Sequence, residues 1–407
     1  MNSFKIELPF TAQLNRSQIF SNRFPESGVY FLTRTIFTQE KNLMSTTRRE
    51  WLKISALSAG ALAFGSVDFA QKADAQNNSG NLIKLSGNEN PYGFSPKAKQ
   101  SMLDALTGGN RYANPETVAR LEQQIAAREG LKSENVVLGT GSGEVLCMAA
   151  IAFGRQEIVA PEPTFPSLMR YAENLGARLK PVALNEKWEH DFGAMAKLTG
   201  ENTSLVYVCN PNNPTASLSP ADALRAFCRE TSKRAPVFAD EAYLEYTDDY
   251  PRNSMVDLVR SGENVIVSRT FSKIYGMAGL RVGYGLARAD VAQKLKKFRM
   301  TWFNSLSIGA ALAAYEDQNF INESRKKNTE VRRAFLSEMD KMNLKYAPSD
   351  ANFVWLNAGA GLDDLGDRMR TRGIWIGNPR GGWQRVTVGT SDEMQKFVAA
   401  FKEIRKV

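Results

Sequence analysis

Short apolar runs recur between residues 136 and 286, separated by longer segments with helical periodicity. The runs are rich in β-branched residues and alternate little with polar ones, which indicates strands that are buried on both faces. Helical segments such as 144–153 and 220–232 lie between them. This alternation predicts an α/β fold, with a mostly parallel sheet between layers of helices. The apolar runs are 136–138, 158–160, 205–209, 237–239, 265–268 and 282–286.

The pattern changes after about residue 300. Two long helical periods and two short strand-like runs follow, at 305–316, 323–342, 352–356 and 385–388. The chain closes with an amphipathic helix whose apolar face is Met394, Phe397, Val398, Phe401 and Ile404. We therefore expect a large domain over 109–300 and a smaller α+β domain over 301–407. Residues 76–108 are expected to form an N-terminal arm and the start of the small domain.

Residues 44–75 have the pattern of an export signal. An Arg-Arg pair at 48–49 precedes an apolar run, 54–67, that is too short and too rich in small residues for a membrane span. A small-x-small pattern at 73–75 is typical of a cleavage site. The order of these parts resembles a bacterial twin-arginine signal. The sequence predicts export to the periplasm by the twin-arginine translocase, or a membrane anchor if the signal stays uncleaved.

An unusually long segment precedes this signal. Signal peptides normally begin near their charged region, whereas residues 1–43 stand before Met44 here. We therefore expect translation to start at Met44. Residues 1–43 would then be an over-extended gene assignment, or alternatively a disordered leader.

Composition narrows the chemistry. The chain is 43% hydrophobic and 23% charged, as is ordinary for a globular protein. Its three cysteines are too few and too widely spaced for a disulfide framework or a zinc site. The one histidine, His190, lies in a polar stretch and is expected at the surface, so acid–base chemistry should rest on other residues and no metal centre is predicted. The net charge of +9 comes without a basic run, so no nucleic-acid partner is predicted.

Four motifs stand at the ends of predicted strands. A glycine-rich turn at 139–144 leads into a helix, whose free N–H groups and positive dipole end favour an anion. An Asn/Pro-rich turn at 210–215, Asp240 and Lys273 each follow another strand. Alone, each has a structural explanation: a tight turn, a helix-capping carboxylate or a solvated lysine. In a parallel sheet, however, all four would meet at one edge, where α/β folds place ligands.

Together the motifs supply the parts of a pyridoxal-phosphate (PLP) site. Such a site needs a lysine for the Schiff base, an acid that keeps the pyridine nitrogen protonated, and polar groups for the ring oxygen. The lysine also moves the substrate's α-proton, so no histidine is required.

From about residue 85 to 401 the chain resembles the fold-type I PLP-dependent aminotransferases, and among them the histidinol-phosphate aminotransferase branch. These enzymes have a large domain with a mostly parallel sheet and a smaller α+β domain. The resemblance rests on the motifs Asn88-Glu89-Asn90-Pro91-Tyr92-Gly93, Arg111-Tyr112, Asn210 to Thr215, Asp240 to Tyr243, Ser272-Lys273 and Ala278-Gly279-Leu280-Arg281.

The resemblance implies a role for each matching residue. Lys273 would form the Schiff base, and Asp240 would pair with the pyridinium nitrogen. Tyr243 and Asn213 would hydrogen-bond the phenolic oxygen of the ring, and Phe165 would stack on the ring. The cofactor phosphate would be bound by Gly141, Ser142, Gly143, Ser272 and Arg281.

Substrates and partners follow from the same resemblance. Arg385 matches the arginine that binds the substrate carboxylate, a task that suits a bidentate guanidinium. Tyr92 would line the substrate pocket. Tyr112 would reach the phosphate bound by a neighbouring subunit, which implies a homodimer with shared active sites. The substrates would be an amino acid, or a related amine, and a 2-oxo acid.

Two other functions stay open at this point. PLP-dependent decarboxylases and racemases use the same scaffold, and threonine-phosphate decarboxylases resemble this branch. A non-catalytic binding protein is the third reading, although a binder has no need of the complete set Lys273, Asp240 and Tyr243.

One departure concerns the substrate. In the histidinol-phosphate branch a Val-Arg pair, whose arginine helps to bind the substrate phosphate, stands where this chain has Ile376-Gly377. Arg380 follows three residues after Gly377, in a loop that differs from that of the relatives. The resemblance therefore predicts the cofactor chemistry more firmly than the substrate.

Overall fold

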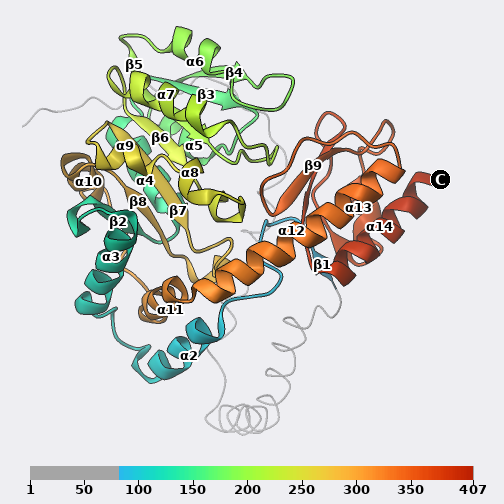
Figure 1. The fold of residues 1–407 in the computed structure, drawn as a ribbon, viewed down its shortest axis with the longest axis horizontal. Helices are drawn as coiled ribbons and strands as arrows, with labels where there is room; N and C mark the ends of the chain where they lie inside the picture. The colour runs from blue at the N-terminus through green and yellow to red at the C-terminus, as the bar shows by residue number, and fades with distance from the viewer. Residues whose placement is uncertain (1–81, 407) are drawn as a thin grey trace, which may run out of the picture. The chain divides into compact units, whose positions relative to one another are not determined.

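The computed structural model describes residues 82–406, so the predicted signal and the segment before it lie outside the described residues. A seven-stranded sheet, in the order β2-β8-β7-β6-β5-β3-β4, forms the centre of the first part (Figure 1). Only β8 runs antiparallel to its neighbours, β2 and β7. The strands are β2 (Val136–Gly139), β3 (Glu157–Glu162), β4 (Arg178–Ala183), β5 (Thr203–Cys209), β6 (Val237–Asp240), β7 (Val265–Thr270) and β8 (Gly283–Leu286). The predicted α/β fold with a mostly parallel sheet is confirmed.

Alternate residues of each strand enter two separate cores. Tyr207 and Phe238 pack on one face of the sheet, against helices α4 (Ser142–Phe153), α5 (Ser167–Asn174) and α10 (Ala289–Lys296). Val206 and Val237 pack on the other face. The helices contributing to that second core include α3 (Pro115–Glu129), α6 (Phe192–Leu198), α7 (Ala221–Ser232) and α9 (Val256–Arg260). Because both faces are covered, the inner strands carry almost no polar alternation, whereas most of the edge strand β4 is exposed or half-buried.

The C-terminal elements form a third core. An antiparallel pair, β9 (Phe353–Asn357) and β11 (Trp383–Thr387), packs with α13 (Leu365–Arg370) and α14 (Ser391–Lys406). The expected apolar face of the last helix is buried there. The short strand β1 (Ile83–Lys84) pairs in parallel with β10 (Ile374–Trp375), which joins the start of the described chain to this core.

Helix α12 (Gln318–Lys341) connects the two parts (Figure 1). Its Ile321 belongs to a core of the sheet part, whereas Phe335 and Met339 belong to the C-terminal core. The four-residue helix α8 (Tyr250–Asn253) precedes α9. None of the helices in the described range is long and apolar enough to cross a membrane.

Two expectations differ from the structure. The boundary expected at residue 300 would place α11 (Ser305–Glu316) in the small domain, yet α11 packs into the core of the sheet part. Its small residues allow a close approach to α2 (Pro96–Ala105), where Gly309 faces Ser101. The change in hydrophobic pattern at residue 300 thus reflects longer helices and does not mark the boundary between the two parts.

His190 is buried and not at the surface as expected. Its Nδ1 lies 2.7 Å from the Ser219 hydroxyl, and its ring stacks on Phe192. Burial lowers the pKa of His190 to about 4, so the imidazole is neutral at neutral pH. The polar neighbours of His190 in sequence hid this contact, because they face solvent while the ring turns inward.

Candidate active site

The ends of three parallel strands bring the predicted site residues together. Cys209 of β5 pairs with Asp240 of β6, and Asp240 pairs with Ser268 of β7. The loops that follow these strands therefore leave the same edge of the sheet. They carry Asn213, Tyr243 and Lys273.

Asp240 is a buried carboxylate with a donor on each oxygen. The Tyr207 hydroxyl donates to Oδ2 at 3.1 Å, and the Ser268 hydroxyl donates to Oδ1 at 3.0 Å. Burial raises the pKa of Asp240, while these hydrogen bonds and the positive charge of Lys273 act in the opposite direction. A cationic ring nitrogen would relieve the cost of burying this carboxylate, which is the task expected of Asp240.

The next residue, Glu241, anchors the strand end. Its carboxylate accepts from the Ser254 hydroxyl, from the Met255 backbone N–H at 2.7 Å and from Arg269 Nε at 3.0 Å. Arg269 also pairs with Glu129 at 2.7 Å, and all three charged groups are buried. Removing one member of such a buried pair typically costs about 3–5 kcal/mol, so this cluster fixes the position of Asp240 firmly.

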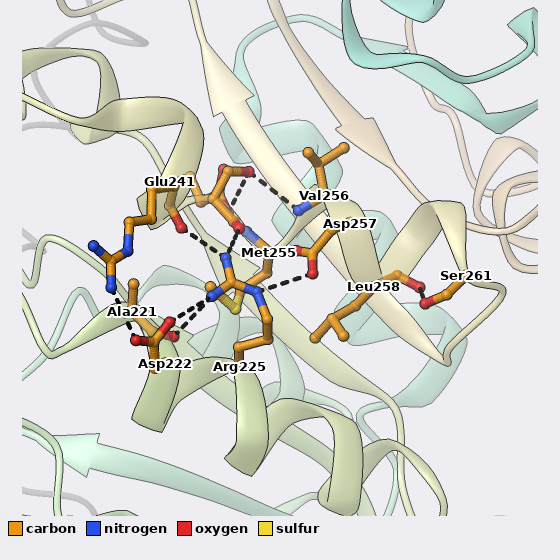
Figure 2. Close-up of polar contacts among 11 residues, drawn as sticks. Ala221, Asp222, Arg225, Glu241, Met255, Val256, Asp257, Leu258 and Ser261 are labelled. Carbon is orange, nitrogen blue, oxygen red and sulfur yellow. Dashed lines mark hydrogen bonds and ion pairs between the residues drawn. The ribbon is translucent and has the colours of Figure 1, made fainter.

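Arg225 of α7 supports the same region from outside. Figure 2 shows Arg225 between Asp222 and Asp257, close to Glu241 and Met255. Its guanidinium also donates to the Ser254 carbonyl at 3.1 Å. Arg225 thus holds the loop whose Ser254 and Met255 bind Glu241.

A chain of hydrogen bonds links Tyr243 to the C-terminal core. The Tyr243 hydroxyl accepts from Asn88 Nδ2 at 3.1 Å and from Asn213 Nδ2 at 3.2 Å. Asn213 Oδ1 in turn accepts from Arg385 Nη1 at 2.8 Å, and Arg385 Nη2 donates to the Ser86 carbonyl at 2.5 Å. Burial raises the pKa of Tyr243, so its hydroxyl stays protonated and can donate to a ring oxygen.

Lys273 lies beside Tyr243. Its Nζ donates to the Gly87 carbonyl at 3.1 Å and lies 5.4 Å from the centre of the Tyr243 ring. Burial, followed by the positive charge of Arg385, lowers the pKa of Lys273 to about 8. A substantial fraction of this amine is therefore neutral near pH 8, as a nucleophilic lysine requires.

The glycine-rich turn forms an anion cradle. Gly141 caps α4 with φ 84°, and a Cβ at this position would collide with the guanidinium of Arg281. Arg281 Nη1 donates to the Ser272 hydroxyl at 3.1 Å. Glycine thus lets a guanidinium approach the helix N-terminus beside a hydroxyl, a set of donors that fits the phosphate of PLP.

Three other predicted site residues differ in where the structure places them. Phe165 lines a cavity of about 930 Å³ together with Asn213 and Arg385. The ring of Tyr92 lies 5.0 Å from Lys327 Nζ and does not line this cavity, so the substrate-binding role of Tyr92 stays a prediction. The side chain of Tyr112 is 87% exposed and reaches none of these groups in its own chain.

Several residues that complete the site have no role predicted from the sequence. Asn88 belongs to a recognised motif, but its bond to Tyr243 depends on the folding back of the N-terminal segment. Tyr207 and Ser268 reach Asp240 only because their strands flank β6. The contacts of Tyr207 and Ser268 with Asp240 could be predicted only with the order of the strands in hand.

Comparisons with known proteins agree with this geometry. Residues 80–401 match the family described as aminotransferase class I and II. A histidinol-phosphate aminotransferase of Halalkalibacterium halodurans is 36% identical over 333 residues, which cover 79% of this chain and 89% of that protein. One of Moorella thermoacetica is 37% identical over 339 residues, covering 79% and 85%. The crystal structure of a histidinol-phosphate aminotransferase from Sinorhizobium meliloti, in complex with pyridoxal-5'-phosphate, has a TM-score of 0.74 and 27% identity, covering 83% of this chain and 94% of that one.

The lowered pKa of Lys273 gives a testable pH dependence. In the cofactor-free protein, acylation of Lys273 by an amine-specific reagent should rise with pH and level off above about pH 8. Peptide mass spectrometry would follow the site, with the exposed Lys341 as the internal control. A Lys273 profile that still rises steeply up to pH 10 would contradict this environment.

Proposed function

We propose the specific function of this protein from the premise that the chain belongs to the aminotransferase class I and II family. It is a PLP-dependent aminotransferase. The cofactor, when bound, supplies an electron sink that stabilises negative charge on the substrate's α-carbon. We propose that the substrates are a 2-amino acid and a 2-oxo acid. One observation carries this proposal. Hydrogen bonds from Arg385 to Asn213 and from Asn213 to Tyr243 place a guanidinium that can bind a carboxylate near the amine of Lys273.

Each residue then has a physical task. Arg385 binds the substrate carboxylate, and Asn213 fixes the orientation of its guanidinium. Lys273 Nζ, as a neutral amine, accepts the proton from the substrate α-carbon and later returns it. Asp240 keeps the ring nitrogen protonated, and the Tyr243 hydroxyl donates to the ring oxygen.

The substrate need not be that of the named relatives. Gly377 lines the cavity at the position where the histidinol-phosphate branch carries its phosphate-binding arginine. Arg380 lies nearby but is exposed. We therefore propose a substrate without a phosphate group.

Two substitutions test the site. Lys273→Ala should abolish the visible absorption of bound PLP and most of the turnover. Arg385→Ala should weaken the binding of carboxylate substrates in the transition state by about 1.5–3 kcal/mol, which lowers kcat/KM roughly 10- to 160-fold. Steady-state kinetics and absorbance spectra would measure both effects, with Arg368→Ala on the surface as control. Full activity in the Lys273 variant would refute the assignment.

We also propose a homodimer with shared active sites. The loop with the exposed Met300 and Trp302 is tied to the cradle, because Glu144 accepts from the backbone N–H of Met300 at 3.1 Å. The exposed Leu106 and Tyr112 follow α2, which packs against α11 just after that loop. Exposed apolar side chains on these neighbouring segments favour a protein partner. A second copy would place its Tyr112 at the cofactor phosphate.

The proposed dimer predicts that a change at Tyr112 affects PLP binding but not dimer formation. Tyr112→Phe should leave the dimer intact in analytical ultracentrifugation but weaken PLP binding roughly tenfold, since one hydrogen bond to a charged group is lost. Tyr171→Phe, on α5, is the matched control and should change neither property. A monomeric wild-type protein would contradict the proposal.

We further propose that the enzyme is exported to the periplasm by the twin-arginine translocase. The support is the ordered pattern at residues 44–75. This route carries folded proteins, which suits an enzyme that loads its cofactor before it leaves the cytoplasm.

Conservative substitution tests export. Replacing Arg48 and Arg49 by lysine should retain the enzyme in the cytoplasm, as measured by cell fractionation and PLP absorbance. Replacing Arg368 and Arg372 by lysine, both partly exposed and outside the signal pattern, is the control and should leave export unchanged. Export that persists in the first variant would rule out the twin-arginine route.

A further inference from the structure

The cavity beside Arg385 has an aromatic wall. Strands β9 and β11 pair in register, with Arg385 opposite Trp355 and Trp383 opposite Asn357. Side chains two apart on a strand share a face, so Trp383, Arg385 and Trp355 lie on the same face of this pair. All three line the cavity, together with Trp188 from a loop of the sheet part.

The tryptophans contact one another. The rings of Trp188 and Trp383 are 4.6 Å apart at 65°, an edge-to-face arrangement. Those of Trp383 and Trp355 are 6.0 Å apart and nearly parallel, at 14°. Both geometries are favourable for aromatic pairs. Trp383 is thus held between two indoles at the cavity surface, which makes a preformed aromatic wall.

The backbone of Trp188 is held in an uncommon conformation. Its φ is 64°, in the left-handed region that large side chains avoid. The Asn185 carboxamide accepts from the backbone N–H of Lys187 and Glu189, each at 2.9 Å, and Ser217 donates to the Trp188 carbonyl at 2.5 Å. Strain of this kind persists where the surrounding structure maintains it, often at ligand sites. Here it directs the indole onto Trp383.

The charges around the cavity suit a neutral side chain. Arg170, Glu173 and Arg380 are exposed and of mixed sign, so they create no strong anion site. The indole N–H of Trp355 is buried and finds no acceptor among the described residues. A buried donor without a partner calls for an explanation, and a bound ligand or water would supply the acceptor.

We propose that this cavity selects 2-amino and 2-oxo acids whose side chain is a planar aromatic ring. The substrate carboxylate binds Arg385, and its ring packs against Trp383 and Trp188. This inference rests on the proposed function, since it assumes that Arg385 is the carboxylate anchor. The volume, about 930 Å³, is ample for a ring of this size beside the cofactor.

Substrate preference tests the inference. The wild-type enzyme should convert phenylalanine and tryptophan with a kcat/KM at least about tenfold above that for alanine, leucine or histidinol phosphate. Trp188→Gly suits the positive φ and should fold, and it should reduce this preference roughly tenfold. Trp383→Leu should act in the same direction. Trp375→Leu, an exposed tryptophan outside the cavity, is the control and should keep the preference.

A binding measurement separates this inference from the proposed function. Calorimetry on the cofactor-free protein should show tighter binding of 3-phenylpropanoate than of hexanoate, and the difference should be lost in Trp188→Gly. If amino acids react without an aromatic preference, or if histidinol phosphate is preferred, the inference is overturned and the transaminase assignment stands. If no amino acid reacts although PLP binds, the proposed function fails, and the calorimetry alone then decides whether the aromatic wall selects its ligand.

Discussion

The hydrogen bond between Arg385 and Asn213 joins the two parts of the molecule at the site. Arg385 extends from the C-terminal pair of strands, whereas Asn213 belongs to the loop after β5. Through Asn213 the contact continues to Tyr243, and through Ser86 it reaches the N-terminal segment. Arg385, the proposed substrate anchor, and the residues proposed to hold the cofactor are therefore positioned by one continuous set of contacts, although they come from different cores.

Burial gives the site its chemistry. The sheet edge is dry enough to lower the pKa of Lys273 and to raise those of Asp240 and Tyr243. Each group is thus moved toward its neutral form, and a bound cofactor returns charge where it is useful. In the nearby buried cluster, the guanidinium of Arg269 pairs with the carboxylates of both Glu129 and Glu241, which adds rigidity close to the reacting groups.

The sequence was informative wherever one residue type has one physical reason to be present. Buried strands produce unbroken apolar runs, and residues at their ends predicted where Lys273 and Asp240 would meet. Prediction from the sequence failed where the position of an element or side chain depends on contacts with distant parts of the chain. Strand β4 gives no apolar run, because it is an edge strand that carries Arg178, Lys180 and Pro181. Likewise, nothing local in the chain shows that Trp188 lies against Trp383, a contact that forms only when the two parts of the protein come together.

The pairing of β1 with β10 has a consequence for biosynthesis. The two strands are about 290 residues apart in the chain, and they close the C-terminal core together. That core cannot be completed on the ribosome until nearly the whole polypeptide has emerged, because contacts this distant in sequence form late. The proposed export of the folded protein would suit this chain. A route that threads the chain across the membrane during synthesis would deliver it before the C-terminal core could close.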